Sequence, residues 1–110
     1  MSPFSKTDTA PAFQMSFKNI WQIVLDRTDE RGRFMFAGMI LSGGSHVQHH
    51  QALAIAGVCE VTPQTATNWL SGAAGCSKEM RLFVAVRAEF DSEIELIKAY
   101  NDYFGLGLDL

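Results

Sequence analysis

A short run of uncharged polar side chains is the first group in this 110-residue chain that could do chemistry. Gln64, Thr65, Thr67 and Asn68 fall within one short segment and bring amides and hydroxyls together. Such groups both donate and accept hydrogen bonds, which is what the base edges in the major groove of DNA require of a protein side chain. The pattern therefore predicts a polar recognition surface.

Three histidines form the second group. His46, His49 and His50 are spaced three and four residues apart, and two imidazoles at helical spacing can share a metal ion. No Asp or Glu lies nearby to complete a ligand set. The sequence favours an exposed polar helix face over a metal site, and we expect neither a metal nor a cofactor.

Catalysis finds little support in the sequence. The chain has no glycine-rich phosphate loop, no H-E-x-x-H motif and no nucleophile elbow. Asp29 and Glu30 accompany Arg27, Arg31 and Arg33 in one polar stretch, which is typical of a solvated charge cluster. We expect a protein that is not an enzyme.

The elements that must position these residues are helical, because apolar residues recur at steps of three and four and never alternate for long. The sequence predicts an all-α fold, a compact bundle of five or six short helices. The expected segments of the first half are a helix from about Phe13 to Arg27, a polar break at 28–32 and helices at 33–41 and 45–56. In the second half we expect a helix capped by Thr62 and closed by Gly72 and another from Ser77. The last helix is capped by Asp91 or Ser92 and closed by Gly105. The expected organisation is a flexible N-terminus at 1–11, a single helical domain at 12–104 and an apolar tail at 105–110.

The segment 52–72 predicts two short helices that cross steeply. Such a corner needs a small residue at the crossing, an apolar residue in the turn and apolar residues one turn apart on the second helix. Ala56, Val61, Ala66 and Trp69 meet these needs, with the turn expected at 57–61.

At this point the chain resembles a known family. VTPQTATNWLSG, with Ala56 five residues before Val61, is similar to the helix-turn-helix of Cro and phage-repressor-type bacterial transcriptional regulators, over about residues 45–90. The helix-turn-helix itself would span about 45–72. The resemblance implies that 62–71 is the recognition helix and 77–90 the support helix. The DNA-binding residues expected on this basis are Thr62, Gln64, Thr65, Thr67, Asn68, Ser71, Lys78 and Arg81.

The sequence departs from the family pattern in two places. Glu60 stands at the turn position where the family usually has glycine. Residues 73–76 lack the Arg and Lys common there, which leaves Lys78 and Arg81 as the nearest phosphate partners.

Composition and charge set the remaining limits. The chain is 47% hydrophobic, yet no apolar stretch approaches the ~20 residues of a membrane helix, and no secretion leader is recognised. Two cysteines, Cys59 and Cys76, are expected as free thiols in a cytoplasmic protein. The net charge is −3, with the acidity concentrated in residues 91–110, so the strongly basic footprint of many nucleic-acid binders is missing.

Two functions follow as expectations. The first is a small DNA-binding transcriptional regulator, an activator or a repressor, whose partners are double-stranded DNA and a second copy of itself. The expected dimer interface consists of apolar stripe residues: Phe17, Ile20, Trp21, Val24, Tyr100, Tyr103 and Phe104.

The alternative is a protein-interaction module, such as an anti-activator that sequesters a transcription factor by occupying its dimerisation surface. The acidic segment 91–110, Glu60 and the apolar stripes at both ends of the chain favour this interpretation.

Overall fold

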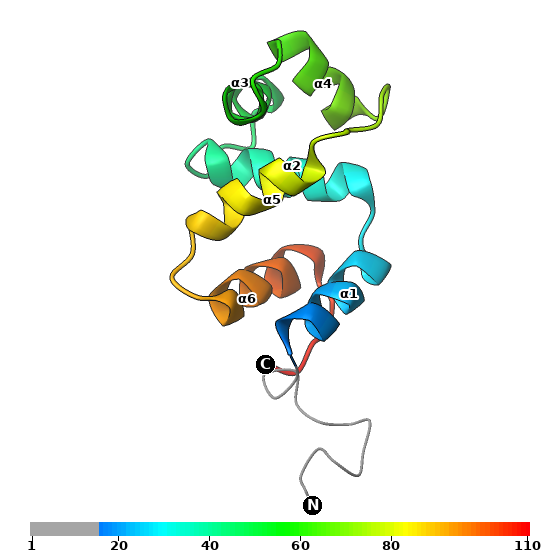
Figure 1. Ribbon diagram of the computed structural model, residues 1–110, viewed down its shortest axis with the longest axis vertical. Helices are drawn as coiled ribbons and strands as arrows, with labels where there is room; N and C mark the ends of the chain where they lie inside the picture. The colour runs from blue at the N-terminus through cyan, green and yellow to red at the C-terminus, as the bar shows by residue number, and fades with distance from the viewer. Residues whose placement is uncertain (1–15) are drawn as a thin grey trace, which may run out of the picture. The chain divides into compact units, whose positions relative to one another are not determined.

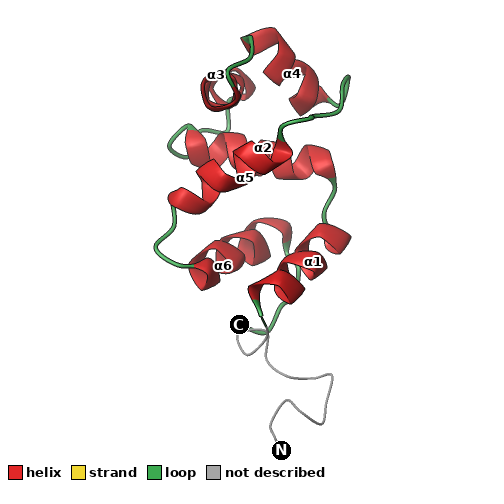
Figure 2. Ribbon diagram, viewed as in Figure 1, coloured by secondary structure: helices red, strands yellow, loops and turns green. Residues whose placement is uncertain are grey.

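The computed structural model describes residues 16–110, and every regular element within them is an α-helix (Figures 1 and 2). The all-helical fold class is confirmed. The six helices are α1 (Phe17–Arg27), α2 (Glu30–Leu41), α3 (Gln48–Cys59), α4 (Pro63–Ser71), α5 (Glu79–Ala88) and α6 (Glu93–Phe104). The expected flexible segment at 1–11 and Phe13 lie outside the described residues.

The described chain forms two compact units, and the predicted domain at 12–104 spans both. The four-helix unit is Asp29–Phe90 and holds α2 to α5. The two-helix unit combines the described residues up to Thr28 with Asp91–Leu110 and holds α1 and α6.

Side-chain caps fix several helix ends where the sequence predicts them. Thr62 Oγ1 accepts from the backbone N–H of Thr65 at 3.2 Å and begins α4, and Ser92 Oγ does the same for Glu95 at 3.2 Å and begins α6. These caps satisfy amides that have no partner inside the helix. Gly72, with φ 82°, ends α4 in the left-handed conformation that glycine adopts without steric cost.

The polar break expected at 28–32 is wrong for most of its length. Glu30 begins α2, and Asp29 caps it by accepting from the backbone N–H of Gly32 at 2.6 Å. Short polar side chains both interrupt an apolar stripe and cap the helix that follows, so the same residues that suggested a loop start the next helix.

The third and fifth helices also begin later than expected. Ser45 does not cap α3, because its hydroxyl accepts from the backbone N–H of Val47 at 3.1 Å in a local turn, and Val47 is the cap residue. At its other end α3 continues past Ala56 to Cys59, which shortens the connection to α4 to residues 60–62. The fifth helix starts at Glu79 rather than Ser77.

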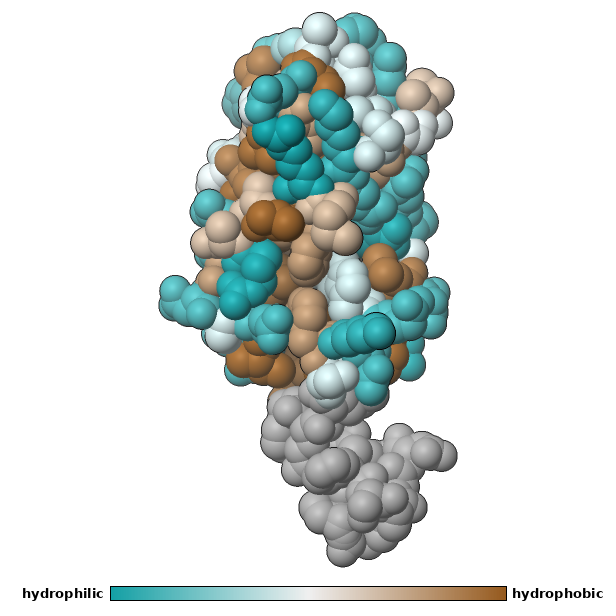
Figure 3. Space-filling view, viewed as in Figure 1, coloured by the Kyte–Doolittle hydropathy of each residue, from teal (hydrophilic) through white to brown (hydrophobic). Residues whose placement is uncertain are grey.

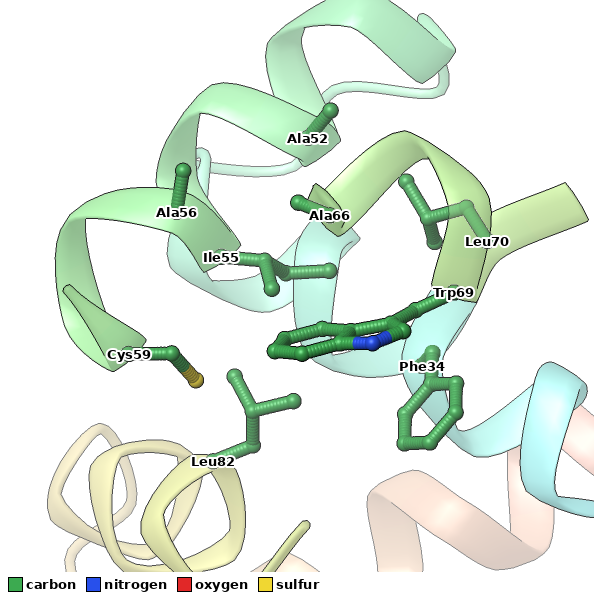
Figure 4. Close-up of a cluster of buried hydrophobic side chains, with 9 residues drawn as sticks. All are labelled: Phe34, Ala52, Ile55, Ala56, Cys59, Ala66, Trp69, Leu70 and Leu82. Carbon is green, nitrogen blue, oxygen red and sulfur yellow. The ribbon is translucent and has the colours of Figure 1, made fainter. Parts of the chain in front are cut away.

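The core of the four-helix unit lies around Trp69. Its indole extends from α4 toward residues of α2, α3 and α5, and the ring centroid lies 6.4 Å from that of Phe34 (Figure 4). Burying one large aromatic side chain removes much apolar surface from water and contributes several kcal/mol, of order 3–5 by the usual cost of truncation to alanine. The whole cluster consists of Phe34, Ala52, Ile55, Ala56, Cys59, Ala66, Trp69, Leu70 and Leu82.

Helices α2 and α3 approach each other closely at Gly38. A β-carbon built on this glycine would lie 2.6 Å from Cβ of Gln51. Gln51 is itself buried, and its amide donates to the Ser45 carbonyl at 2.9 Å, so its side chain is held in place. The close approach therefore depends on the missing side chain of Gly38.

In the two-helix unit, aromatic rings join α1 to α6. Trp21 and Tyr100 meet edge to face with ring centroids 5.0 Å apart. The C-terminal tail is tied to the same unit, because Arg27 donates to the Leu106 carbonyl at 3.0 Å and the Asn101 side chain both donates to and accepts from the Leu108 backbone. None of the helices within residues 16–110 has the length and apolarity needed to cross a membrane.

Replacing Gly38 with alanine is expected to lower the free energy of unfolding by about 1–3 kcal/mol, because the added methyl group overlaps the Gln51 side chain. Gly57 provides the matched control. It also lies within a helix, but no atom lies within 4 Å of the place that an added methyl group would take, so Gly57→Ala should gain roughly 0.5–1 kcal/mol from helix propensity. Urea denaturation measures both, and a Gly38→Ala protein as stable as Gly57→Ala would contradict the close approach.

Candidate nucleic-acid interface

The corner between α3 and α4 is a tight turn centred on Glu60. This residue ends α3 with φ 58° and ψ 47°, the left-handed region, and no other non-glycine residue in the described chain has a positive φ. The turn is closed by the backbone N–H of Val61, which donates to the Ala56 carbonyl at 3.1 Å. The position where the resemblance implies glycine is thus one where glycine would adopt the backbone angles without strain.

The inner side of α4 is fully covered. Ala66, Trp69 and Leu70 are 0, 5 and 2% exposed and pack into the core cluster. The predicted inner residues Ala56, Ala66 and Trp69 are confirmed as buried, while Val61 is partly buried against the same cluster. Because these contacts fix the rotation of α4 about its axis, they also determine which side chains point away from the core.

The outer side of α4 carries the predicted polar residues. Thr62, Gln64 and Ser71 are exposed, and Thr65, Thr67 and Asn68 are half-buried. The Ser71 hydroxyl is engaged within α4, because it donates to the backbone carbonyl of Asn68 at 3.2 Å. Thr62 and Thr65 share a hydrogen bond between their hydroxyls at 3.0 Å.

Gln64 and Asn68 form an amide pair across one turn of α4. Gln64 Nε2 donates to Asn68 Oδ1 at 3.0 Å. This bond leaves Gln64 Oε1 as an acceptor and Asn68 Nδ2 as a donor; Gln64 is exposed and Asn68 half-buried. One donor and one acceptor are what adenine requires of a side chain in the major groove.

The two predicted phosphate contacts are already engaged within the chain. Lys78 Nζ donates to the Cys59 carbonyl at 3.0 Å, and Arg81 forms an ion pair with Glu60. The remaining cations of the four-helix unit have internal partners as well: Arg31 with the Leu70 carbonyl, Arg33 with Glu79, and Arg87 with the Phe90 carbonyl. The expected solvated charge cluster is exposed at Arg27, Asp29, Glu30 and Arg31, and is wrong only for Arg33, whose side chain is 13% exposed. Arg31 and Arg33 also join α4 and α5 to α2.

The residues expected at a dimer interface lie in the two-helix unit. Ile20, Val24 and Tyr100 are buried at 4, 0 and 3% exposure, so their side chains are not available to a second copy. Of the others, Phe17, Trp21 and Phe104 are half-buried and stack on neighbouring rings, and Tyr103 is 38% exposed. The apolar stripes of α1 and α6 thus pack largely within the chain.

Both cysteines are free thiols, as expected. Burial raises the pKa of Cys59, with Lys78 and Arg81 acting in the opposite direction. Burial also raises the pKa of Cys76, although the backbone N–H of Lys78 donates to its sulfur at 3.2 Å and acts to lower it. The three histidines are exposed, and residues 16–110 contain no group of three or more His, Cys, Asp or Glu that could hold a metal ion.

Replacing Glu60 with glycine should make the protein more stable than replacing it with alanine, by about 1 kcal/mol. Both substitutions remove the exposed ion pair with Arg81, which contributes little. They differ in backbone freedom, because alanine at φ 58° remains strained while glycine does not. Urea denaturation of the two variants gives the difference, and equal stability would mean that residue 60 is not left-handed.

The raised pKa values of the thiols predict a loss of stability in alkaline solution. An unfolded thiol ionises near its ordinary pKa of 9.0, whereas the folded chain retains both protons to higher pH. The unfolded state therefore loses protons first, and the free energy of unfolding should fall as the pH rises above about 9. The double variant Cys59→Ala, Cys76→Ala should show a shallower fall in urea denaturation between pH 8 and 10, and an identical slope would contradict the assignment.

Comparison with known proteins adds no identification. No family model, no curated protein and no solved structure matches this chain. The geometry of the corner and the side chains of α4 are the features that bear on its function.

Proposed function

We propose that the four-helix unit binds double-stranded DNA and that the protein is a small transcriptional regulator. The observation that carries this proposal is the amide pair of Gln64 and Asn68 on the outer side of α4, opposite a fully buried inner side. A short helix held at a tight corner with its polar side exposed fits the width of the major groove.

The amide pair suggests how a base would be read. Gln64 Oε1 accepts a hydrogen bond from the base while Asn68 Nδ2 donates one, with the bond between the two side chains fixing their spacing. A single amide side chain that makes both bonds to adenine discriminates against other bases by about 1–3 kcal/mol, which sets the scale for the pair. Thr62 and Thr65 lie at the start of the same helix and supply hydroxyls for further contacts.

The proposal includes a homodimer, because α4 has nine residues and one such helix reads few base pairs. Two copies related by a two-fold axis would place their helices in successive major grooves, about one helical turn apart. The operator would then be a palindrome.

The charge distribution indicates modest affinity. DNA phosphates would have to compete with Glu60 for Arg81 and with the Cys59 carbonyl for Lys78. Each phosphate contact contributes roughly 0.9 to the slope of log affinity against log salt, so few contacts mean a shallow slope. Specificity would come mainly from the uncharged side chains of α4.

Gln64→Ala and Asn68→Ala are each expected to weaken binding about tenfold or more, since each removes half of the amide pair. The probe is a labelled duplex enriched from a random-sequence pool by repeated binding to the purified chain, and the measurement is fluorescence anisotropy. Gln22→Ala is the matched control, because Gln22 forms the same kind of bond, to Asp26 at 2.9 Å, on helix α1.

The outcomes distinguish the role of α4 from DNA binding in general. If the α4 variants lose binding and Gln22→Ala does not, α4 is supported as the reading helix. Unchanged binding by both α4 variants rejects it, and a pool that never enriches a duplex rejects DNA binding itself.

A further inference from the structure

A groove of about 640 Å³ runs along α5 beside the end of α3. Its lining includes the apolar side chains of Val58, Met80, Val84 and Ala85 and the cations Lys78 and Arg81. We call this the α5 groove. All of these residues belong to the four-helix unit.

The apolar part of the α5 groove faces solvent. Met80 is 74% and Val84 60% exposed, the highest values among the large apolar side chains of the described chain. They lie four residues apart on α5 and so form a stripe along one side of the helix. In Figure 3 apolar side chains reach the surface among hydrophilic ones on the face where α5 lies in front. Exposed apolar stripes with a polar rim are typical of binding surfaces.

The charge of the α5 groove is of one sign. Its lining contains two cations and no carboxylate. The partner of Lys78 is a carbonyl, which leaves the ammonium charge uncompensated, and the partner of Arg81 is Glu60 in an ion pair whose side chains are 50 and 72% exposed. Because such exposed pairs contribute little, another carboxylate can displace Glu60.

We propose that the α5 groove binds an amphipathic helix of another protein whose apolar stripe is flanked by Asp or Glu. Leucine-like side chains at helical spacing would cover Met80 and Val84, and the flanking carboxylates would face Lys78 and Arg81. Met80 suits this role because its unbranched side chain adapts to different apolar surfaces.

Charge favours this occupant over two others. Two copies of the chain facing each other through their α5 grooves would bring like charges together, which disfavours self-association. DNA would match the cations but not the exposed side chains of Met80 and Val84. The occupant would also engage Lys78 and Arg81, the two expected phosphate contacts, and its binding to the groove requires no DNA.

The test uses the full chain and two labelled peptides of about 18 residues, long enough to form a helix. Both carry leucines at helical spacing, and they differ in that the flanking residues are Glu in one and Lys in the other. Fluorescence anisotropy should show binding of the Glu peptide and at least about tenfold weaker binding of the Lys peptide.

The variant Met80→Ala, Val84→Ala should weaken binding of the Glu peptide at least about tenfold. Both residues are exposed, so the fold is retained, which circular dichroism checks. Leu53→Ala is the control, because Leu53 is an exposed apolar residue, 46% exposed, on α3 outside the groove.

Three results would overturn the proposal. They are the failure of both peptides to bind, equal binding of the Glu and Lys peptides, and undiminished binding by the double variant. Sedimentation showing a dimer that the double variant abolishes would assign the groove to a second copy instead.

Discussion

The burial of Trp69 is the constraint on which the rest of the four-helix unit depends. With Ala66 and Leu70 it holds α4 against the core, and its ring lies near that of Phe34. Successive residues of an α-helix are rotated by about 100°. If the inner side slipped by one residue, Gln64 and Asn68 would turn away from their outward positions. The chemistry available on the surface of α4 is therefore set by an indole that is itself buried.

The cations of the four-helix unit have structural roles that a net charge does not reveal. Lys78 binds the carbonyl of Cys59 at the end of α3, and Arg31 binds that of Leu70 near the end of α4 at 2.7 Å. Cations are favourable at helix C-termini, where carbonyl groups lack partners within the helix. The same side chains thus stabilise the corner through carbonyl contacts, and their positive charge stays uncompensated.

Local chemistry in the sequence was sufficient to predict some of this architecture. Thr62, Ser92 and Gly72 end or begin helices through contacts within three or four residues, so their roles can be inferred from neighbours in the chain. The α2 boundary was missed because Asp29 caps a helix with the same polarity that suggested a loop. Small and aromatic residues in 52–72 correctly indicated the inner side of α4.

Features that join distant residues could not be predicted. Arg31 and Leu70 are 39 residues apart, and the sequence around either residue does not predict their contact. The apolar stripes of α1 and α6 posed a similar difficulty, because a stripe is equally suited to a partner protein and to another helix of the same chain. The burial of Ile20, Val24 and Tyr100 and the contact of Trp21 with Tyr100 show that α1 and α6 use their apolar stripes within the chain.

The discontinuity of the two-helix unit bears on how the protein emerges from the ribosome. The segment Asp29–Phe90 is contiguous and can collapse while later residues are still being added. Helix α1 is made earlier yet has to wait for α6, its partner in the contact of Trp21 with Tyr100. During that interval the apolar stripe of α1 lacks its partner and is open to chaperones.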